Sequence, residues 1–390
     1  MSRKFRVGSV GLGHRGRAVV KAANTEIESF EVVATCDRNP DLFYKPVHFY
    51  YGGDKPAFKE ELPNATFYQD FDEMLEKADL DILIVETPAT CHAELCAKAL
   101  KHGIHVYSEV PSVSSFQEAD MLWKAQQESD HMLMTGASTC GWGFVLALQD
   151  LVKKGILGKP FAMEAEYIHD MRELWEETPW RKPSKENPWY PITYCTHPLG
   201  PLLSIIDEDL KQVSCMSTGS HVTDLEAAHD FMTAICQTPS GVIVKLTCSF
   251  INCSKTGLHS YRVFGTEGYF EHLSSRGSEP PKTRFNSNVL YGADSLTELP
   301  VTFTPKEVEE WKKKNPLVGF GHGGADSYIM HQFESALLNG EKKAPCDLKA
   351  SLRMTLPGLF ALKSALNGGA LQKIYYPWDS DWESFLNTQK

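Results

Sequence analysis

Three glycines near the N-terminus have the spacing of a turn that holds a dinucleotide phosphate. Gly11, Gly13 and Gly16 form a G-x-G-x-x-G pattern between a run predicted as a strand and a run predicted as a helix. The first glycine permits a tight bend, the second lets the backbone approach a pyrophosphate, and the third lets helix and strand pack closely. The helix N-terminus adds N–H donors and a favourable dipole. The alternative is a turn that glycines shape without any ligand.

An acidic residue follows at the end of the second predicted strand. The Asp37 carboxylate can accept hydrogen bonds from both hydroxyls of an adenosine ribose, and it repels the 2′-phosphate of NADP. Arg38 beside it can pair with that phosphate instead. The pattern therefore predicts NAD as the cofactor, with NADP as the less favoured alternative.

The elements that must position these residues alternate in type through the first third of the chain. Strands are predicted at 5–10, 30–35, 81–85, 105–108 and 131–135, with helices from about 15, at 90–102 and at 115–129. Near-continuous apolar strands that alternate with helices indicate a doubly wound parallel sheet. The segment 40–64, rich in aromatic residues, proline and lysine, interrupts this alternation and is interpreted as a surface insertion at a rim of the active site.

Beyond residue 137 longer strands dominate. They are predicted at 162–167, 212–217, 230–237, 242–250 and 260–264, with hairpin turns at 237–241 and 265–268 and helices at 144–154, 325–338 and 348–366. We therefore predict an α/β protein. An N-terminal Rossmann domain spans residues 1–136, and a C-terminal α+β domain with a large, mostly antiparallel open sheet spans residues 137–390.

Composition excludes several classes of protein. The formal net charge is −11 and no dense run of Lys and Arg occurs, which argues against a nucleic-acid partner. The ten cysteines include no CxxC pair, so no zinc site is predicted. No apolar run is long enough to span a membrane and no export signal precedes the first strand. We expect a cytoplasmic protein with a small-molecule substrate and no membrane partner.

Several spaced motifs resemble the Gfo/Idh/MocA family of sugar and polyol oxidoreductases. They are Glu86-Thr-Pro-Ala-Thr-Cys-His92, Ala99-Leu-Lys-His-Gly-Ile-His-Val-Tyr-Ser-Glu-Val-Pro111, Gly155-Ile-Leu-Gly-Lys-Pro160 and Gly265-Thr-Glu-Gly268. The resemblance implies that the cofactor contacts Gly11, Leu12, Gly13, His14, Arg15, Gly16, Asp37, Arg38, Thr87, Pro88, His92, Glu109, Val110 and Pro111. It also implies a homo-oligomer, a dimer or tetramer, formed through the exposed face of the second sheet.

One departure from the family pattern concerns the chemistry. The family's E-K-P lysine, which usually contacts the reacting hydroxyl, is Val110 here. This departure resembles the NAD-dependent glycosidases of glycoside hydrolase family 109. The motifs shared with that branch are Glu109-Val-Pro111, Glu166-Tyr-Ile-His-Asp170, Tyr194-Cys-Thr-His-Pro-Leu-Gly-Pro201 and His322-Gly-Gly-Ala-Asp326. Cys195 and Pro198 depart from the branch pattern, which has proline and glycine there.

The resemblance implies hydride transfer at a ring hydroxyl, C3, in a cycle of oxidation, elimination, hydration and reduction that leaves NAD unchanged. A conventional sugar or polyol dehydrogenase that releases NADH is the nearest alternative. A nucleotide-binding sensor without catalysis is the other.

Side chains for proton transfer are expected in the second half of the chain. His197 is the first candidate at the reacting hydroxyl, because imidazole titrates near neutral pH. Tyr167 and His169 share one face of a strand and are candidates at C2 and at the leaving group. The remaining expected site residues are Tyr194 and His322 as further catalytic groups, and Trp180, Arg181 and Asp326 as substrate contacts.

Structural interpretations remain open for several of these residues. Tyr167 is equally well explained as a core aromatic residue, and the glycines after His322 by a helix that starts at Asp326. His229 and His259 are expected to be structural. A metal bound by Glu166, His169, Asp170 and His197 is disfavoured, since no short ligand spacing supports it.

Overall fold

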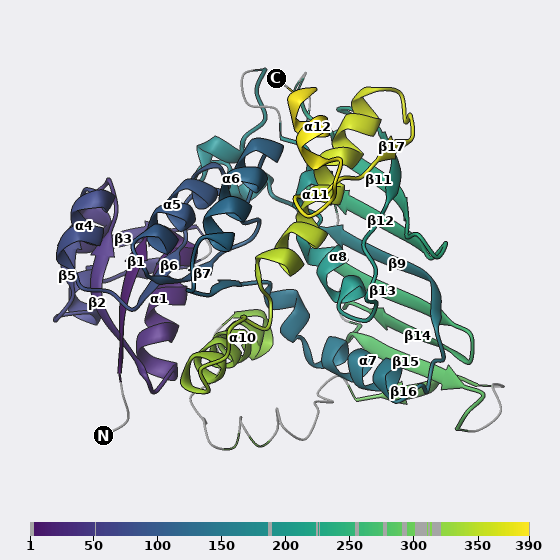
Figure 1. The fold of residues 1–390 in the computed structure, drawn as a ribbon, viewed down its shortest axis with the longest axis horizontal. Coiled ribbons are helices and arrows are strands. Elements are labelled where there is room, and N and C mark those ends of the chain that lie inside the picture. Colours follow the sequence, from purple (N-terminus) through teal and green to yellow (C-terminus); the bar gives the residue numbers. More distant parts are fainter. Residues whose placement is uncertain are drawn as a thin grey trace. The chain divides into compact units, whose positions relative to one another are not determined.

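The computed structural model describes residues 4–50, 52–185, 189–223, 225, 227–253, 257–275, 279–290, 295–300, 310, 313 and 321–389. The chain divides into two compact units (Figure 1). The first contains residues 1–138 and 311–352, and the second contains residues 139–310 and 353–390. The sequence analysis ended the first domain at residue 136, whereas the structure adds a C-terminal segment with α10 (Gly321–Leu338) to it.

The first unit is built on a parallel sheet of six strands in the order β5-β2-β1-β6-β7-β8. Its strands are β1 (Phe5–Val10), β2 (Phe30–Cys36), β5 (Thr66–Tyr68), β6 (Ile82–Val85), β7 (His105–Ser108) and β8 (Leu133–Thr135). Its longer helices are α1 (His14–Glu26), α4 (Phe71–Lys77), α5 (Ala89–Lys101) and α6 (Phe116–Gln127). The predicted Rossmann sheet is confirmed, while the sequence analysis missed β5 and α4.

Helix α10 joins this unit because its apolar stripe completes the core of the sheet. Ile329, Met330 and Phe333 are buried in one cluster with residues of β1, β2 and α1. The buried Glu334 carboxylate accepts hydrogen bonds from the backbone N–H and hydroxyl of Ser29, 2.9 and 2.6 Å long. In Figure 1, α1 and α10 lie on one side of the sheet and α5 and α6 on the other.

The segment predicted as a surface insertion contributes to the core. It forms α2 (Asp41–Tyr44), the hairpin β3 (Val47–Phe49) and β4 (Gly53–Lys55), and α3 (Phe58–Glu61). Phe43 and Phe58 are almost fully buried, and the Arg17 guanidinium of α1 lies 4.6 Å from the centre of the Phe58 ring. Its phenylalanines Phe43, Phe49 and Phe58 are therefore core residues, whereas Tyr44 and Tyr50 are about half exposed.

The second unit is built on a nine-stranded sheet in the order β16-β15-β14-β13-β9-β12-β11-β10-β17. Its strands are β9 (Pro160–Ile168), β10 (Gln212–Ser217), β11 (Phe231–Gln237), β12 (Ile243–Ser249), β13 (Leu258–Gly265), β14 (Gly268–Leu273), β15 (Lys282–Ser287), β16 (Thr297–Leu299) and β17 (Gln372–Lys373). Only the β12–β9 pairing is parallel among these described strands. The predicted mostly antiparallel sheet is confirmed.

Helices cover one face of this sheet. They are α7 (Gly143–Lys153), α8 (Thr196–Leu203), most of α11 (Leu348–Leu366) and the short C-terminal α12 (Trp382–Asn387). The side chains on β11 alternate accordingly, since Met232, Ala234 and Cys236 are buried while Ile235 is 53% exposed. The predicted strands do not include β14 to β17: the predicted turn at 265–268 only precedes β14, and β15 to β17 are short or mostly polar.

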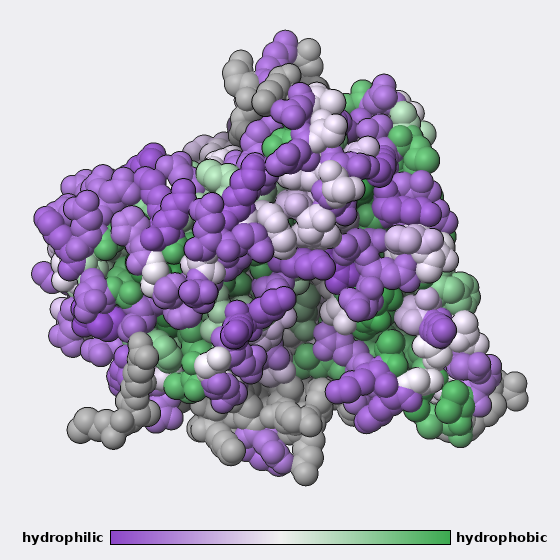
Figure 2. Space-filling model, in the orientation of Figure 1, coloured by the Kyte–Doolittle hydropathy of each residue, from purple (hydrophilic) through white to green (hydrophobic). Residues whose placement is uncertain are grey.

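The face of the first unit that Figure 2 shows is mainly hydrophilic. In Figure 2, purple residues cover most of the part that Figure 1 labels α1, α4 and α5. Within the described residues, no helix is long and apolar enough to cross a membrane.

Candidate active site

The glycine turn between β1 and α1 has the backbone that a dinucleotide requires. Gly11 has φ +95°, and a Cβ there would lie 2.5 Å from the carbonyl oxygen of Glu86. A Cβ on Gly16 would lie 2.1 Å from the carbonyl oxygen of Gly11, so helix and turn can approach only without a side chain. A Cβ on Gly13 would meet nothing within 4 Å, and this is the glycine expected to face the pyrophosphate. The turn therefore fits the cofactor.

The first turn of α1 supplies donors for an anion. Gly13 is the N-cap and provides no side-chain cap, and no acidic residue occurs in this turn. The helix dipole and the N-terminal N–H groups therefore favour a phosphate at this end. His14 opens the helix and stacks on Phe49 of the β3–β4 hairpin, with 5.3 Å between the ring centres.

Asp37 lies where an adenosine ribose is expected, at the end of β2. Its carboxylate accepts hydrogen bonds from the backbone N–H of Leu12 at 2.8 Å and of Asn39 at 2.9 Å. Each carboxylate oxygen has further lone pairs for the ribose hydroxyls. Arg38 is exposed. An acidic side chain at this position fits NAD better than NADP, whose 2′-phosphate it would repel.

His92 supports the cofactor site indirectly. Its side chain is 1% exposed, and its two ring nitrogens lie 2.8 Å from the carbonyl oxygen of Pro111 and 2.6 Å from that of Thr87. The sequence analysis counted His92 among the residues that contact the cofactor. In the structure its imidazole connects the loop after β6 with the loop after β7, and a direct contact with the cofactor stays a prediction.

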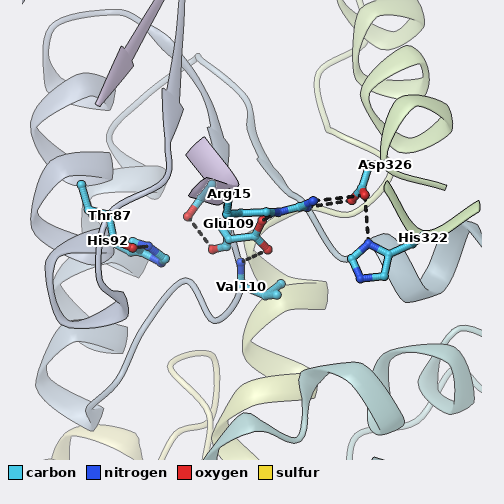
Figure 3. A network of polar contacts seen from close by, with 8 residues as sticks. Arg15, Thr87, His92, Glu109, Val110, His322 and Asp326 are labelled. Atoms are coloured by element: carbon cyan, nitrogen blue, oxygen red, sulfur yellow. Dashed lines mark hydrogen bonds and ion pairs between the residues drawn. The ribbon is translucent and has the colours of Figure 1, made fainter. Parts of the chain in front are cut away.

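A network of ion pairs occupies the carboxyl edge of the parallel sheet (Figure 3). The Arg15 guanidinium bonds Glu109 Oε2 at 2.7 Å and both oxygens of Asp326, at 3.1 and 2.7 Å. Glu109 Oε1 also accepts the backbone N–H of Val110 at 3.0 Å. Arg15 thus joins the glycine turn, the loop after β7 and helix α10, a role that the sequence alone did not show.

Asp326 orients His322. Its side chain is 2% exposed, and Oδ2 lies 2.9 Å from His322 Nδ1. Burial would raise the pKa of Asp326, but hydrogen bonds from His322 and Arg15 hold it well below its ordinary value. The carboxylate therefore stays ionised and engaged with two partners. The expected contact of Asp326 with the substrate stays a prediction.

The loop that carries His322 has an unusual backbone. His322, Gly323 and Gly324 all have positive φ values, of 46°, 68° and 92°. A left-handed conformation at a residue with a Cβ costs on the order of 1 kcal/mol, and such residues cluster at functional sites. This left-handed turn explains Gly323 and Gly324, and the start of the helix at Asp326 is a second reason for glycines here. The His322 side chain is 37% exposed.

Glu86 is a site residue that sequence reasoning missed. It directly follows β6, its side chain is 9% exposed, and neither carboxylate oxygen accepts a hydrogen bond from a donor among the described residues. Burial first, and the neighbouring Glu109 carboxyl second, raise its pKa well above the ordinary value. The available signal was an acidic residue immediately after four apolar strand residues, at the carboxyl end of a parallel strand.

The second unit gathers most of the predicted proton-transfer residues. The His197 ring centre lies 5.0 Å from that of Tyr167 and 4.8 Å from that of Tyr194. The rings of Tyr167 and His169 are 6.0 Å apart and nearly parallel, as expected for one face of a strand. We call Tyr167, His169, Tyr194 and His197 the tyrosine–histidine cluster. The structure brings these four predicted residues together.

Local structure holds this cluster in place. His197 lies in the first turn of α8 and is 7% exposed, and its carbonyl oxygen accepts the hydroxyl of Tyr261 at 3.0 Å. Burial raises the pKa of Tyr167 well above its ordinary value, and the nearby Arg181 opposes this shift. His259, which sequence reasoning treated as structural, has its ring centre 4.8 Å from that of Tyr167.

Trp180 and Arg181 lie together on a short 3-10 helix. The guanidinium of Arg181 is 4.5 Å from the centre of the Trp180 ring, and Trp180 is 43% exposed. The positive charge of Arg181 lowers the pKa of Tyr167. Among the described residues, no group of three or more His, Cys, Asp or Glu side chains is arranged to hold a metal ion.

Two family descriptions match consecutive parts of the chain. Residues 5–137 match the oxidoreductase family with an NAD-binding Rossmann fold, Gfo/Idh/MocA, and residues 145–271 match the Gfo/Idh/MocA C-terminal domain. The chain belongs to the Gfo/Idh/MocA family of oxidoreductases, and its cofactor is NAD.

Relatives narrow the branch. The chain is 26% identical to glycosyl hydrolase family 109 protein 1 of Bacteroides fragilis over 372 residues, which cover 86% of this chain and 77% of that protein. It is 23% identical to a glycosyl hydrolase family 109 protein of Solibacter usitatus, over 94% of this chain and 87% of that protein. The predicted likeness to this branch is confirmed.

Solved structures share the fold. The myo-inositol 2-dehydrogenase of Lactobacillus plantarum superposes with a TM-score of 0.72 at 15% identity, over 96% of this chain and all of that one. The scyllo-inositol dehydrogenase of Lactobacillus casei, solved with NAD(H) and scyllo-inositol, gives 0.71 at 15% identity, over 95% and 99% of the two chains.

Proposed function

We propose that this enzyme cleaves a glycoside in a redox-neutral cycle that starts by oxidising the C3 hydroxyl of the sugar. One observation carries the proposal. The loop after β7 has the buried Val110 where the family pattern has lysine, while two tyrosines and two histidines gather in the tyrosine–histidine cluster. Relatives at 26% identity carry the glycosyl hydrolase name. An enzyme that only oxidises a hydroxyl needs one base, whereas elimination needs proton transfer at further atoms.

His197 removes the proton of the C3 hydroxyl. NAD supplies the hydride acceptor for this oxidation and returns the hydride at the end of the cycle. The C3 ketone makes the C2 hydrogen acidic, and His169 removes that proton while the bond from C1 to the aglycone oxygen breaks. Burial raises the pKa of Tyr167, so its phenol stays protonated and serves as a hydrogen-bond donor. Water then adds across the resulting double bond, the proton returns to C2, and the reduced C3 hydroxyl regains its proton from His197.

His322 and Tyr194 serve the leaving group and the substrate. The Asp326 carboxylate holds the proton of His322 on Nδ1, so that Nε2 is the nitrogen that carries the lone pair. When Nε2 takes up a proton, the imidazole can donate that proton to the departing aglycone oxygen. The exposed Trp180 ring can stack on a pyranose face, and Arg181 can donate hydrogen bonds to its hydroxyls.

Deuterium incorporation tests the proposal directly. Nitrophenyl glycosides of both anomers are incubated in D₂O, and release of nitrophenol is followed together with NADH absorbance. The cycle predicts aglycone release without net NADH and deuterium at C2 of the sugar product. Cleavage with unlabelled product would contradict elimination.

The conventional dehydrogenase remains the second candidate because the structural neighbours include inositol dehydrogenases. It predicts net NADH from free sugars or polyols and no aglycone release. The variant His197→Ala separates catalysis from sensing, because an enzyme loses turnover while it still binds NAD. A sensor has no turnover to lose.

We also propose that copies of this chain pair through the uncovered face of the second sheet. Met216, Ile235 and Ile243 are 64%, 53% and 38% exposed on the neighbouring strands β10, β11 and β12, and they give this face an exposed apolar patch. The variant Ile235→Asp should shift the mass measured by light scattering toward the monomer; an unchanged mass would contradict this interface.

The ten free cysteines are consistent with a protein that functions in the reducing cytoplasm.

A further inference from the structure

Glu86 is a buried carboxyl group that no step of the proposed cycle uses. Both of its oxygens are inaccessible to solvent and face no hydrogen-bond donor in the described part of the chain. Glu86 also forms the floor of the cofactor turn, because its carbonyl oxygen is the atom that Gly11 approaches and its Cβ would be 3.1 Å from a Cβ on Gly16. A carboxylate without a donor is costly to bury, so this group needs a proton or a cation.

The charged groups around Glu86 do not supply that cation. Arg15 is the one guanidinium among the described residues of this network, and it pairs with Glu109 and Asp326; its charge lowers the pKa of Glu86 less than burial and Glu109 raise it. If Glu86, Glu109 and Asp326 were all ionised, their negative charge would exceed the positive charge of Arg15 by two. Tyr107 of β7 is neutral because burial, reinforced by Asp326, raises its pKa far above its ordinary value. His322 of α10 faces Asp326.

The order of the strands places Glu86 on the nicotinamide side of the cofactor. Asp37 ends β2 on one side of β1, whereas Glu86 and Glu109 follow β6 and β7 on the other side. A dinucleotide whose ribose binds Asp37 and whose pyrophosphate binds the glycine turn extends its second half toward β6. The oxidised nicotinamide ring is a cation, while the reduced ring is neutral.

We propose that Glu86 is a proton-exchanging carboxyl that senses the oxidation state of the cofactor: it is protonated in the free protein and ionised when NAD⁺ is bound, and it keeps its proton with NADH. Binding of NAD⁺ then releases one proton from Glu86, and the resulting carboxylate stabilises the nicotinamide cation. This inference rests on NAD being the cofactor, and it holds whether the enzyme is a glycosidase or a dehydrogenase.

Infrared difference spectroscopy on cofactor-stripped protein tests the protonation state. The wild type should show the C=O stretch of a buried protonated carboxyl, which NAD⁺ removes and NADH leaves in place. Glu86→Gln should lack this band from the start. Glu61→Gln is the matched control, because the Glu61 carboxyl pairs with Arg17 and Lys21 and its pKa is lowered, so it is ionised throughout.

Equilibrium binding gives a second, independent measurement. While Glu86 is protonated in the free protein, the Kd for NAD⁺ should fall about tenfold for each unit of pH increase, because one proton is released. The Kd for NADH should not change with pH, and Glu86→Gln should lose the NAD⁺ dependence but still bind both forms. A wild-type band that NAD⁺ leaves intact, or equal pH dependence in wild type and Glu86→Gln, would overturn the proposal. Failure to bind NAD at all would instead refute the cofactor assignment.

Discussion

The glycine turn allows a sharp test, since two of its glycines are expected to fail in different ways. In Gly16→Ala, the new Cβ would lie 2.1 Å from the Gly11 carbonyl oxygen, a backbone atom that cannot rotate away. Helix α1 must therefore move away from the turn by about an ångström to restore an ordinary contact. Overpacking of this kind costs roughly 1–3 kcal/mol in folding free energy.

Gly13→Ala is the matched partner of this variant. A Cβ there meets no protein atom within 4 Å, and the backbone has φ −62°, which alanine adopts readily. Alanine is a poorer N-cap than glycine, so a cost of at most about 1 kcal/mol is expected. The methyl group would, however, occupy the space expected for the pyrophosphate. Gly13→Ala should thus lose NAD affinity at least tenfold while its stability without cofactor changes little.

Thermal unfolding of cofactor-stripped protein and fluorescence titration with NADH measure the two effects separately. Each kcal/mol lowers the unfolding midpoint by roughly 2–4 °C in a unit of this size. Gly16→Ala should lose both stability and affinity, whereas Gly13→Ala should lose affinity alone. If Gly16→Ala unfolds at the wild-type temperature, or if Gly13→Ala is destabilised as strongly, the reasoning from this turn is refuted.

Three further predictions follow from other contacts. Asp326→Asn removes the negative charge between Arg15 and His322. It should lower the free energy of unfolding, measured with denaturant, by roughly 1–3 kcal/mol, and it should shift the pH profile of turnover. An unshifted profile would show that Asp326 does not act through His322. Burial lowers the pKa of His272 to about 4, so the unfolded chain binds an extra proton between pH about 6.5 and 4, and stability should fall as the pH drops through that window. His272→Phe, which keeps the ring stack on Phe144, should lose this part of the pH dependence in unfolding experiments. Asp37→Ser should raise the Kd for NAD about tenfold and reduce the preference for NAD over NADP. Equal NAD affinities in variant and wild type would refute the assignment of Asp37 to the ribose site.

Local patterns determined most of the fold. The strands predicted at 5–10, 105–108 and 212–217 coincide with β1, β7 and β10, because each segment has apolar residues at the positions that face the core. The glycine spacing identified the cofactor turn for a similar reason, since a left-handed Gly11 and a tight approach at Gly16 are requirements of the backbone itself. Short or polar strands such as β16 and β17 carry no such pattern and were missed.

The i, i+2 spacing of Tyr167 and His169 is sufficient to place both side chains on one face of a strand, because side chains alternate between the two faces. That His197 and Tyr194 stand against the same face depends on how α8 packs on β9 and β12, which no local spacing encodes. His259 lies beside Tyr167 because β13 pairs with β9.

The sequence by itself determined which residues are chemically able to act, because residue type and local spacing follow from the chain alone. Only the tertiary structure decided what each one does. Arg15 and Asp326 are 311 positions apart and meet because the apolar stripe of α10 completes the core beside α1. Burial and two partners made Asp326 a carboxylate that orients His322, and burial left Glu86 as a carboxyl group without a donor among the described residues. Both outcomes depend on desolvation and on neighbours distant in sequence, which no linear pattern records.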